Sequence, residues 1–370
     1  MKKLPLSILA IYGLLASVCM QAQNAVSPLP PVHAATPHVV PTNVPGVYAF
    51  TQPPASFNPR TATKEELESW GYPARPDVSE GPEALARWLE EVNPVLKRSV
   101  PQLMTRSNTY NRQALNFKAG ATSLKATAAT SSNWSGYALV AAGGAAPYNK
   151  VTGRWIVPAV KQAPGTCSGG WDYSSEWVGI DGASNSDLLQ AGSQANVYCD
   201  IGQNITEYFP WIEWLPAAEM VIYKNASTEA LYPFAPGDYL IVTVTATNFS
   251  GGASTSGTLS FSDVTQGWAV ALTFTASSLG GSQVVGQDVE WIVERTEVNG
   301  SLATLPDYVA DPWIYAQGWD TNNVLYDPGA PGTATDYKIT MLDNSSNPES
   351  YVLLAGANGL WFYPEGSAVQ

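Results

Sequence analysis

The chain has 370 residues, of which 45% are hydrophobic and 11% aromatic, and its formal net charge is −13. A chain of this length can bury a large hydrophobic core, in one large domain or two ordinary ones. So negative a surface repels phosphate groups, which excludes a nucleic acid as partner. The 31 glycines and 28 prolines indicate many turns, as in all-β proteins.

The first residues are typical of an export signal. Lys2 and Lys3 precede an apolar run over residues 4–18, and small residues follow up to Ala22. About 15 apolar residues are too few to span a bilayer, and no later segment looks transmembrane. The sequence therefore predicts a signal peptide over residues 1–22 and a secreted protein that is not bound to a membrane.

Residues 23–128 are predicted to form a pro-segment that combines extended chain with short helices. Residues 23–60 are rich in proline, alanine, valine and threonine without a helical or strand period, which indicates a linker or an extended segment. Thr63, followed by glutamates, predicts the start of one helix. Pro82 precedes a second helix, whose apolar stripe consists of Ala84, Leu85, Trp88, Leu89 and Val92.

Positive and negative charges are distributed unequally along the chain. Residues 26–128 hold ten Lys and Arg against eight Asp and Glu, whereas residues 129–370 hold six against 23, so the net charge changes from +2 to −17. Acid would protonate many of these carboxylates, so the second part is expected to tolerate acid, with solubility as the alternative reason for its charge. A basic pro-segment before an acidic domain predicts an inhibitor bound by ion pairs that acid breaks, unless it is a second domain of unrelated purpose.

From about residue 130 onward, short apolar runs alternate with clusters of Gly, Ser, Asn and Pro. Val, Ile, Thr and aromatic residues dominate these runs, and residues 242–245 alternate valine with threonine. No convincing helix of ten residues follows in the sequence. We therefore expect residues 129–370 to form an antiparallel all-β sandwich, with strands near 136–140, 152–157, 177–180, 208–214, 240–247, 269–274, 289–293, 337–341 and 360–363.

Two cysteines, Cys167 and Cys199, remain after removal of the signal peptide. An even number of cysteines in an exported protein predicts a disulfide, which here closes a loop of about 33 residues. Such a bond would stabilise the fold by about 3 kcal/mol. Two free buried thiols are the alternative.

Catalysis by histidine is excluded in the predicted β domain. The two histidines of the chain, His33 and His38, both lie in the N-terminal linker. This removes Ser-His-Asp and Cys-His chemistry and the usual His-based zinc sites. Carboxylates, amides, tyrosines and backbone dipoles remain, which fits peptidases with carboxylate-activated water and glycosidases with paired carboxylates.

Several segments of the β domain place aromatic residues beside acids and amides. They are residues 132–137, 176–182, 188–192, 211–216 and 288–294. Because side chains alternate along a strand, Glu290 and Glu294 are expected to share one face, opposite to Trp291.

In their order and spacing these segments resemble the glutamic peptidases, the eqolisin family of acid endopeptidases, over about residues 130–363. In that family a Gln in a Leu-Gln-x-Gly strand and a Glu in a later x-Glu-aromatic-Ile-apolar-Glu strand form the catalytic dyad, which matches Gln190 and Glu290 here. The family's site-lining segments match this chain at Trp134, Trp177, Asp181 and Glu213. The resemblance implies a lectin-like sandwich of two curved, antiparallel seven-stranded sheets whose concave face holds the substrate. The stretch 315–350 departs from the family pattern, so the pairing of the last strands is not predicted.

The chemistry that the resemblance implies follows from the two side chains. Ionised Glu290 can take a proton from water and return it to the leaving amine. Gln190 stays neutral at every pH, and its two N–H donors can position the water and stabilise the oxyanion. Asp181 and Glu213 are expected to orient this dyad through hydrogen bonds. We expect the groove to be lined by Trp134, Trp177 and Trp214.

The sequence thus predicts a secreted acid endopeptidase that acts as a monomer on proteins or peptides without a metal or another cofactor. Its own pro-segment is expected to inhibit it. We expect the precursor to cut itself below about pH 5 within residues 118–131, which are rich in alanine, threonine, serine and glycine.

Two alternatives use the same residues differently. In a secreted acid glycoside hydrolase, Glu290 and Glu294 would form the carboxylate pair, about 6.8 Å apart along one strand. Gln190 would then have no role. In a non-catalytic carbohydrate-binding β-sandwich, the tryptophans would form platforms for sugar rings.

Overall fold

The computed structural model describes the N-terminal half of the chain in several stretches and most of the remainder without interruption. The described residues are 36–93, 96–106, 110–111, 118–122, 126–165, 167, 169–200 and 202–364. The predicted signal peptide and His33 lie outside these residues, whereas residues 35–370 form one compact unit. In the part of the chain that the structure describes, no helix is both long and apolar enough to cross a membrane.

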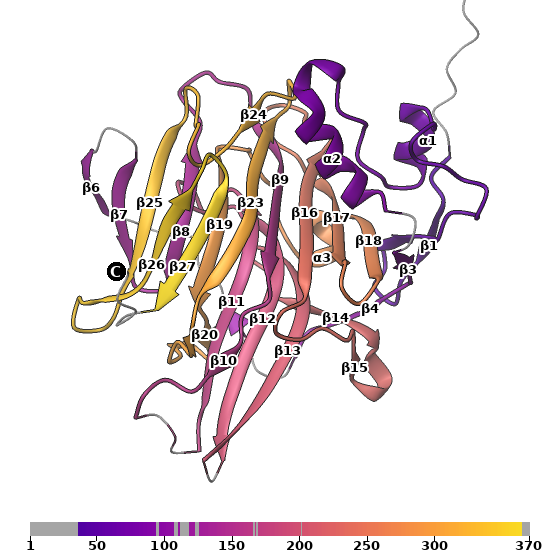
Figure 1. The fold of residues 1–370 in the computed structure, drawn as a ribbon. Coiled ribbons are helices and arrows are strands. Elements are labelled where there is room, and N and C mark those ends of the chain that lie inside the picture. Colours follow the sequence, from indigo (N-terminus) through magenta and orange to yellow (C-terminus); the bar gives the residue numbers. More distant parts are fainter. Residues whose placement is uncertain are drawn as a thin grey trace, which may run out of the picture. The chain divides into compact units, whose positions relative to one another are not determined.

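Two antiparallel sheets face each other across the main core (Figure 1). They are named the front and the back sheet here without reference to the viewpoint of the figure. In spatial order, the front sheet consists of β14 (Met220–Asn225), β13 (Gln203–Trp214), β12 (Leu189–Asp200), β11 (Trp171–Ile180), β19 (Asp288–Arg295), β8 (Trp134–Val140) and β25 (Thr335–Leu342). The back sheet consists of β18 (Trp268–Thr275), β17 (Ser256–Asp263), β16 (Tyr239–Thr247), β9 (Tyr148–Ile156), β23 (Asp311–Asp320), β27 (Gly359–Pro364) and β26 (Pro348–Ala355). β26 also pairs with β25, so the two sheets are continuous at this corner. The predicted all-β sandwich is confirmed. The C-terminal strands, whose pairing was not predicted, pair in the order β8, β25, β26, β27 and β23.

Shorter elements connect these strands or precede them. Before the front sheet come β1 (Val39–Pro41), β2 (Tyr48–Phe50), α1 (Lys64–Ser69), α2 (Gly81–Glu91), β3 (Lys97–Arg98), β4 (Gln102–Met104), β5 (Tyr110–Asn111), β6 (Lys118–Thr122) and β7 (Thr127–Ser131). Within the sandwich are β10 (Val160–Lys161), β15 (Ala230–Leu231), α3 (Ala276–Leu279), β20 (Glu297–Val298), β21 (Ser301–Leu302), β22 (Asp307–Tyr308) and β24 (Leu325–Tyr326). Val78–Glu80 and Ala226–Thr228 form single 3₁₀ turns.

Alternation of side chains along each strand separates two apolar clusters. The main core lies between the sheets and contains Trp155, Trp291 and Trp313, of which Trp155 and Trp313 stack with their ring centroids 4.6 Å apart. A second cluster, with Trp177 and Ile292, lies on the opposite face of the front sheet. The central strands β8, β11, β12 and β19 are therefore buried on both faces, which explains why their sequences are apolar beyond strict alternation.

The two predicted helices form where expected. α1 begins directly after Thr63, whose side chain accepts from the N–H of Glu66 in a capping box. α2 begins at Gly81, with proline in its first turn. Its Trp88 packs with Leu67 of α1 in a small separate cluster. Leu85, expected on the apolar face, is instead 42% exposed.

Two segments for which the sequence predicted no strand contain strands. In the first, β1 and β2 form a hairpin, and β2 also pairs with β18 at the edge of the back sheet. In the second, β7 pairs in parallel with β25 at the edge of the front sheet. An exposed sheet edge offers free N–H and C=O groups, so it can recruit extended chain of any composition. The expected domain boundary after residue 128 consequently falls inside β7.

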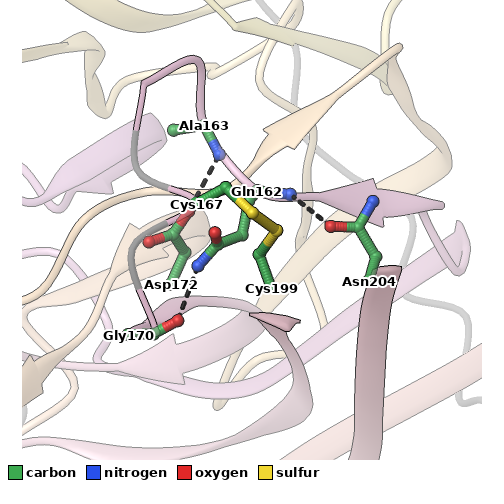
Figure 2. Close-up of a disulfide and its surroundings, with 7 residues drawn as sticks. All are labelled: Gln162, Ala163, Cys167, Gly170, Asp172, Cys199 and Asn204. Atoms are coloured by element: carbon green, nitrogen blue, oxygen red, sulfur yellow. Dashed lines mark hydrogen bonds between the residues drawn. A yellow bond between two sulfur atoms is a disulfide. The ribbon is translucent and has the colours of Figure 1, made fainter. Parts of the chain in front are cut away.

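The predicted disulfide between Cys167 and Cys199 is present, with the two Cα atoms 5.1 Å apart. It attaches the loop before β11 to the end of β12 (Figure 2). Beside it, the Ala163 N–H donates to Asp172 at 2.8 Å, and the Gln162 side chain donates to the Gly170 carbonyl at 2.6 Å. The loop is thus held at both of its ends.

Candidate active site

One row of residues crosses the front sheet on the face that is turned away from the main core. Glu290 on β19 lies opposite Gly179 on the neighbouring strand β11. Gly179 in turn lies opposite Gln190 on β12, and Gln190 lies opposite Glu213 on β13. Directly opposed residues point to the same face of a sheet. The two residues of the predicted dyad therefore lie on one face, two strands apart, although 100 positions separate them in the sequence.

Gly179 lies between Gln190 and Glu290 and leaves space for their side chains to approach each other. Strands in a sheet are about 4.8 Å apart, so the backbones of Gln190 and Glu290 are separated by about 10 Å. A Cβ atom at position 179 would lie 3.1 Å from Glu290 Oε2 and 2.9 Å from Leu188 Cδ1. The Glu290 carboxyl therefore leans over β11 toward Gln190, and the missing side chain gives it the room to do so.

The amide of Gln190 is held by its neighbour on β13. Gln190 Nε2 donates to Glu213 Oε2 at 2.6 Å, and both side chains are buried. Gln190 Oε1 has no hydrogen-bond partner in the described part of the chain. The bond to Glu213 directs the amide nitrogen toward β13 and sets the rotation of the whole amide plane. The arrangement agrees with the expected orienting role of Glu213.

Glu290 is fully buried, and neither of its carboxyl oxygens has a hydrogen-bond partner within the described residues. Burial raises the pKa of Glu290 well above its usual value, and the nearby carboxyls of Asp288 and Asp181 raise it further. No cation is among these causes. Both causes favour the neutral, protonated form of the Glu290 carboxyl.

Two aspartates join the loops that border Glu290 in a reciprocal way. Asp181, at the end of β11, accepts from the N–H groups of residues 285–287, at 2.5 to 2.9 Å, just before β19. Asp288, at the start of β19, accepts from the N–H groups of Ala183 and Ser184 just after β11, at 2.9 and 3.1 Å. Each of the two loops beside Glu290 is thus held by an aspartate next to the other loop.

Asp181 occupies a turn, and its carboxyl accepts the hydrogen bonds from the loop before β19. Its φ of 66° lies in the left-handed region, which aspartate tolerates better than most residues. Burial, and then the charge of Asp288, raise the pKa of Asp181 to about 6. Asp181 contacts the loop before β19 rather than Gln190 or Glu290 themselves.

Two of the three tryptophans that were expected to line the groove pack beside the row. Trp134 and Trp177 form an edge-to-face pair with centroids 4.8 Å apart, and both are fully buried. Trp177 Nε1 donates to Glu294 Oε2 at 2.8 Å, and Asn133 donates to Oε1 at 3.2 Å. Glu294 is therefore a buried structural acceptor, and its hydrogen bonds to Asn133 and Trp177 argue against a role as the second carboxylate of a glycosidase.

Trp214 does not line this face. It follows Glu213 on β13, so its side chain points to the opposite face and belongs to the main core between the sheets. Its ring centroid lies 6.0 Å from that of Phe274 in the back sheet, and its Nε1 donates to the Gln283 carbonyl at 3.2 Å. Strand alternation alone excluded Trp214 from the groove once Glu213 was assigned to it.

Two residues of the site were missed by the sequence analysis. Asp288 could have been found, because it lies two positions before Glu290 and must share its face. Gly179 lies inside one of the aromatic segments, but its place between the dyad depends on the register of three strands. No pattern along one strand encodes that register.

Among the described residues, no group of three or more His, Cys, Asp or Glu side chains is arranged to hold a metal ion. A family model described as the Peptidase A4 family matches residues 132–324, which is 193 of the 370 residues. No curated protein sequence matches the chain. Among solved structures, aspergilloglutamic peptidase from Aspergillus niger is similar, with 23% identity and a TM-score of 0.41, over 52% of this chain and 99% of that one.

Proposed function

Because the chain belongs to the Peptidase A4 family and is a glutamic-type endopeptidase, we propose that it hydrolyses peptide bonds in acid with Glu290 as base and Gln190 as oxyanion donor. The observation that carries this proposal is the row in which Glu290, Gly179 and Gln190 lie side by side on three strands. It brings a carboxyl and an amide to one face with no side chain between them. A peptide carbonyl and a water can then contact both groups at once.

Each group has one role in the reaction. The oxygen of a water attacks the peptide carbonyl carbon while its proton passes to the Glu290 carboxylate. Gln190 donates an N–H to the oxygen on which negative charge develops. Glu290 then returns the proton to the nitrogen of the scissile bond, which breaks, and the carboxylic acid and amine products leave. Glu213 supports this by holding the amide of Gln190, and Asp288 and Asp181 hold the loops around Glu290.

The acid preference of the enzyme follows from the surroundings of Glu290. Burial is the first cause of its raised pKa in the closed form. Entry of solvent and substrate would reduce that effect and lower the pKa toward its usual range, so the base becomes available when the face opens. A carboxylate base of ordinary pKa suits hydrolysis at acid pH.

The burial of both Gln190 and Glu290 in the full-length chain supports its role as a precursor. Arg106, in the proposed pro-segment, makes two hydrogen bonds to the Glu207 carboxylate, at 2.6 and 2.8 Å. Its guanidinium lies 4.6 Å from the centroid of Phe209. Glu207, Phe209 and Glu213 are separated by even numbers of positions on β13, so their side chains point to the same face. Arg106 therefore binds to the face that carries the dyad. The contact is an ion pair between basic pro-segment and acidic domain, of the kind that acid would break.

The remaining parts of the proposal are export and processing. A signal peptide over residues 1–22 would deliver the precursor outside the cell, where the disulfide can form. The pro-segment, residues 23–128, would keep the enzyme inactive until acid allows a cut within residues 118–131. Proteins or peptides would be the substrates, and the enzyme would act as a monomer.

Hydrolysis of a denatured protein substrate between pH 2 and 8 tests the proposal, with acid-treated wild type and Glu290→Gln side by side. We expect wild type to be most active near about pH 3–4 and the variant to lose about 10³-fold or more in kcat. The variant should keep the melting temperature of wild type within a few degrees, since glutamine has nearly the same volume. Equal activity of the two proteins would remove Glu290 from the mechanism.

A further inference from the structure

The described residues between 36 and 106 complete the edges of both sheets. Along the back sheet, β2 pairs with β18 in antiparallel register, with Ala49 opposite Leu272. β3 pairs with the same strand in parallel, with Lys97 opposite Trp268. Along the front sheet, β4 pairs with β14, with Leu103 opposite Ile222. The terminal strands of both sheets therefore have their backbone groups bonded by the N-terminal region.

The same region contributes side chains to the main core. Val47 and Ala49 are completely buried, and Leu103 is 2% exposed. All three belong to the cluster that lies between the sheets, together with Val244, Leu272 and Ile222. Their burial does not depend on the helices, which form a separate small cluster of their own. The sandwich core is thus incomplete without these strands.

A buried ion pair also joins the region to the back sheet. Arg154 of β9 is 2% exposed and donates to Glu90 at 2.6 Å and to Glu91 at 2.9 Å. It also donates to the Arg87 carbonyl at 3.0 Å, at the C-terminal end of α2. Here the pro-segment supplies the anions and the β domain the cation, the reverse of the Arg106–Glu207 contact. Removing α2 would leave a guanidinium on the sheet without these partners.

The proposed processing region lies beyond all of these contacts. Residues 118–131 follow β4 and β5, and β7 within them pairs with β25 at the other edge of the front sheet. A cut between β6 and β7 would therefore separate the chain without touching the strands that β18 and β14 hold. The edge pairing and the shared core would persist at any pH, and the buried ion pair would persist at neutral pH.

We propose that residues 36–106 stay bound to the sandwich after the chain is cut, as a noncovalent second chain that supplies edge strands to both sheets. Activation then requires a break in the connecting chain, and departure of the N-terminal region is unnecessary. The inference rests on the proposed function for the position of the natural cut. Its physical content, however, can be tested in a chain that has no activity.

The test uses the full-length Glu290→Gln variant with a recognition sequence for a site-specific protease inserted between residues 122 and 126. After cleavage, size-exclusion chromatography at pH 7 and pH 4 with about 1 µM protein separates bound from free fragments. We expect both fragments to elute together in equal amounts at both pH values, because an interface that forms part of a core holds at this concentration. Separate elution of a folded sandwich and a free N-terminal fragment would overturn the proposal. Failure of Glu290→Gln to abolish hydrolysis would refute the mechanism and leave this result unaffected.

Two variants of the N-terminal fragment identify the contacts responsible. Leu103→Asp places a charge in the shared core and should release at least half of the fragment after cleavage. Val100→Asp, in the same segment, changes a residue that is 43% exposed and should leave co-elution unchanged. The uncut chain of each variant, measured by its melting temperature, establishes that the starting protein is folded. Equal co-elution of the two variants would contradict the inferred role of β4.

Discussion

Two buried clusters of charged groups, one on each sheet, are built on opposite principles. On the front sheet Asp181, Asp288 and Glu290 lie together, and no cation is among the causes that raise the pKa values of Asp181 and Glu290. On the back sheet the guanidinium of Arg154 is buried against two glutamates of α2. Protonation therefore stabilises Asp181 and Glu290 in the first cluster, whereas the ion pairs of the second cluster need ionised carboxylates. Acid therefore favours the site and weakens the attachment of α2.

The difference shows that net charge alone does not determine how a protein responds to pH. The sequence analysis treated the pro-segment as the basic partner and the β domain as the acidic one. Arg106 and Glu207 follow this pattern, but Arg154 reverses it. The response to acid depends on which carboxyls are buried without a cation and which are paired with one.

The largest expected effect concerns the amide of the dyad. Gln190→Glu removes the N–H donor and places a second carboxyl opposite Glu213, so kcat should fall by about 10²- to 10³-fold. Gln194→Glu serves as a matched control, because Gln194 is buried on the same strand and bonds to Asn196 rather than to the row. Hydrolysis at pH 3 to 4 measures both. A Gln190→Glu enzyme with the activity of wild type would show that the amide donates nothing to the transition state.

The next effect concerns the space between the two catalytic groups. Gly179→Ala adds a methyl group 3.1 Å from Glu290 Oε2 and 2.9 Å from Trp177. The carboxyl must move away from Gln190, so we expect a loss of about 10- to 100-fold in kcat/KM with a smaller loss of stability. Gly170→Ala is the control, because nothing lies within 4 Å of the added atom. Kinetics combined with thermal unfolding would distinguish a displaced carboxyl from a damaged sheet.

The free energy of unfolding of the protein should decrease as the pH rises. Burial raises the pKa of Asp336 to about 8, and neither of its oxygens has a hydrogen-bond partner in the described residues. A carboxyl with a raised folded-state pKa binds its proton more tightly in the folded state. Its contribution is therefore present below about pH 4 and is lost as the pH rises to 8. The same sign applies to Asp181, with a pKa of about 6, and to Asp263, with a pKa of about 7.

Asp336→Asn isolates this effect. We expect the variant to be more stable than wild type by about 1 to 3 kcal/mol at pH 8 and nearly equal to it at pH 4. Asp343→Asn is the control, since hydrogen bonds from Asn347 lower the pKa of that exposed carboxyl. Urea unfolding at the two pH values provides the measurement. A wild-type protein that is most stable at pH 8 would contradict the assigned sign.

The smallest expected effect concerns the back sheet. Arg154→Met removes the cation from Glu90 and Glu91, and we expect a loss of about 2 kcal/mol at pH 7, reduced because Glu90 is half exposed. At pH 3 the loss should be smaller, since acid protonates glutamates in wild type as well. Glu83→Gln, which removes a surface ion pair on the same helix, should change stability by less than about 0.5 kcal/mol. A loss from Arg154→Met that is independent of pH would indicate packing rather than charge.

Features that depend on neighbouring positions in the chain could be predicted from the sequence. Alternation within strands predicted the sandwich and placed Glu290 and Glu294 on one face. The capping pattern at Thr63 predicted the first residue of α1. Trp214 was assigned wrongly because the same alternation was not applied to its pair with Glu213.

Features that depend on the register between strands could not be predicted in this way. The alignment of Gly179 with Gln190 and Glu290 results from hydrogen bonds among strands that are far apart in the sequence. The edge strands β2 and β7 were missed because their backbone groups, rather than their side chains, determine their place. The burial of Arg154 under α2 likewise arises where two regions meet.

Gln190 and Glu290, the proposed catalytic groups, lie on β12 and β19, on either side of β11. The main chain therefore sets the distance between them. Two strand spacings determine it, and the hydrogen-bond pattern of a sheet allows those spacings little variation. Substitutions in the surrounding loops and indole rings can therefore alter which peptides bind without changing the geometry of the reaction. A protein of this construction can therefore change its specificity while the fold keeps the spacing of Gln190 and Glu290.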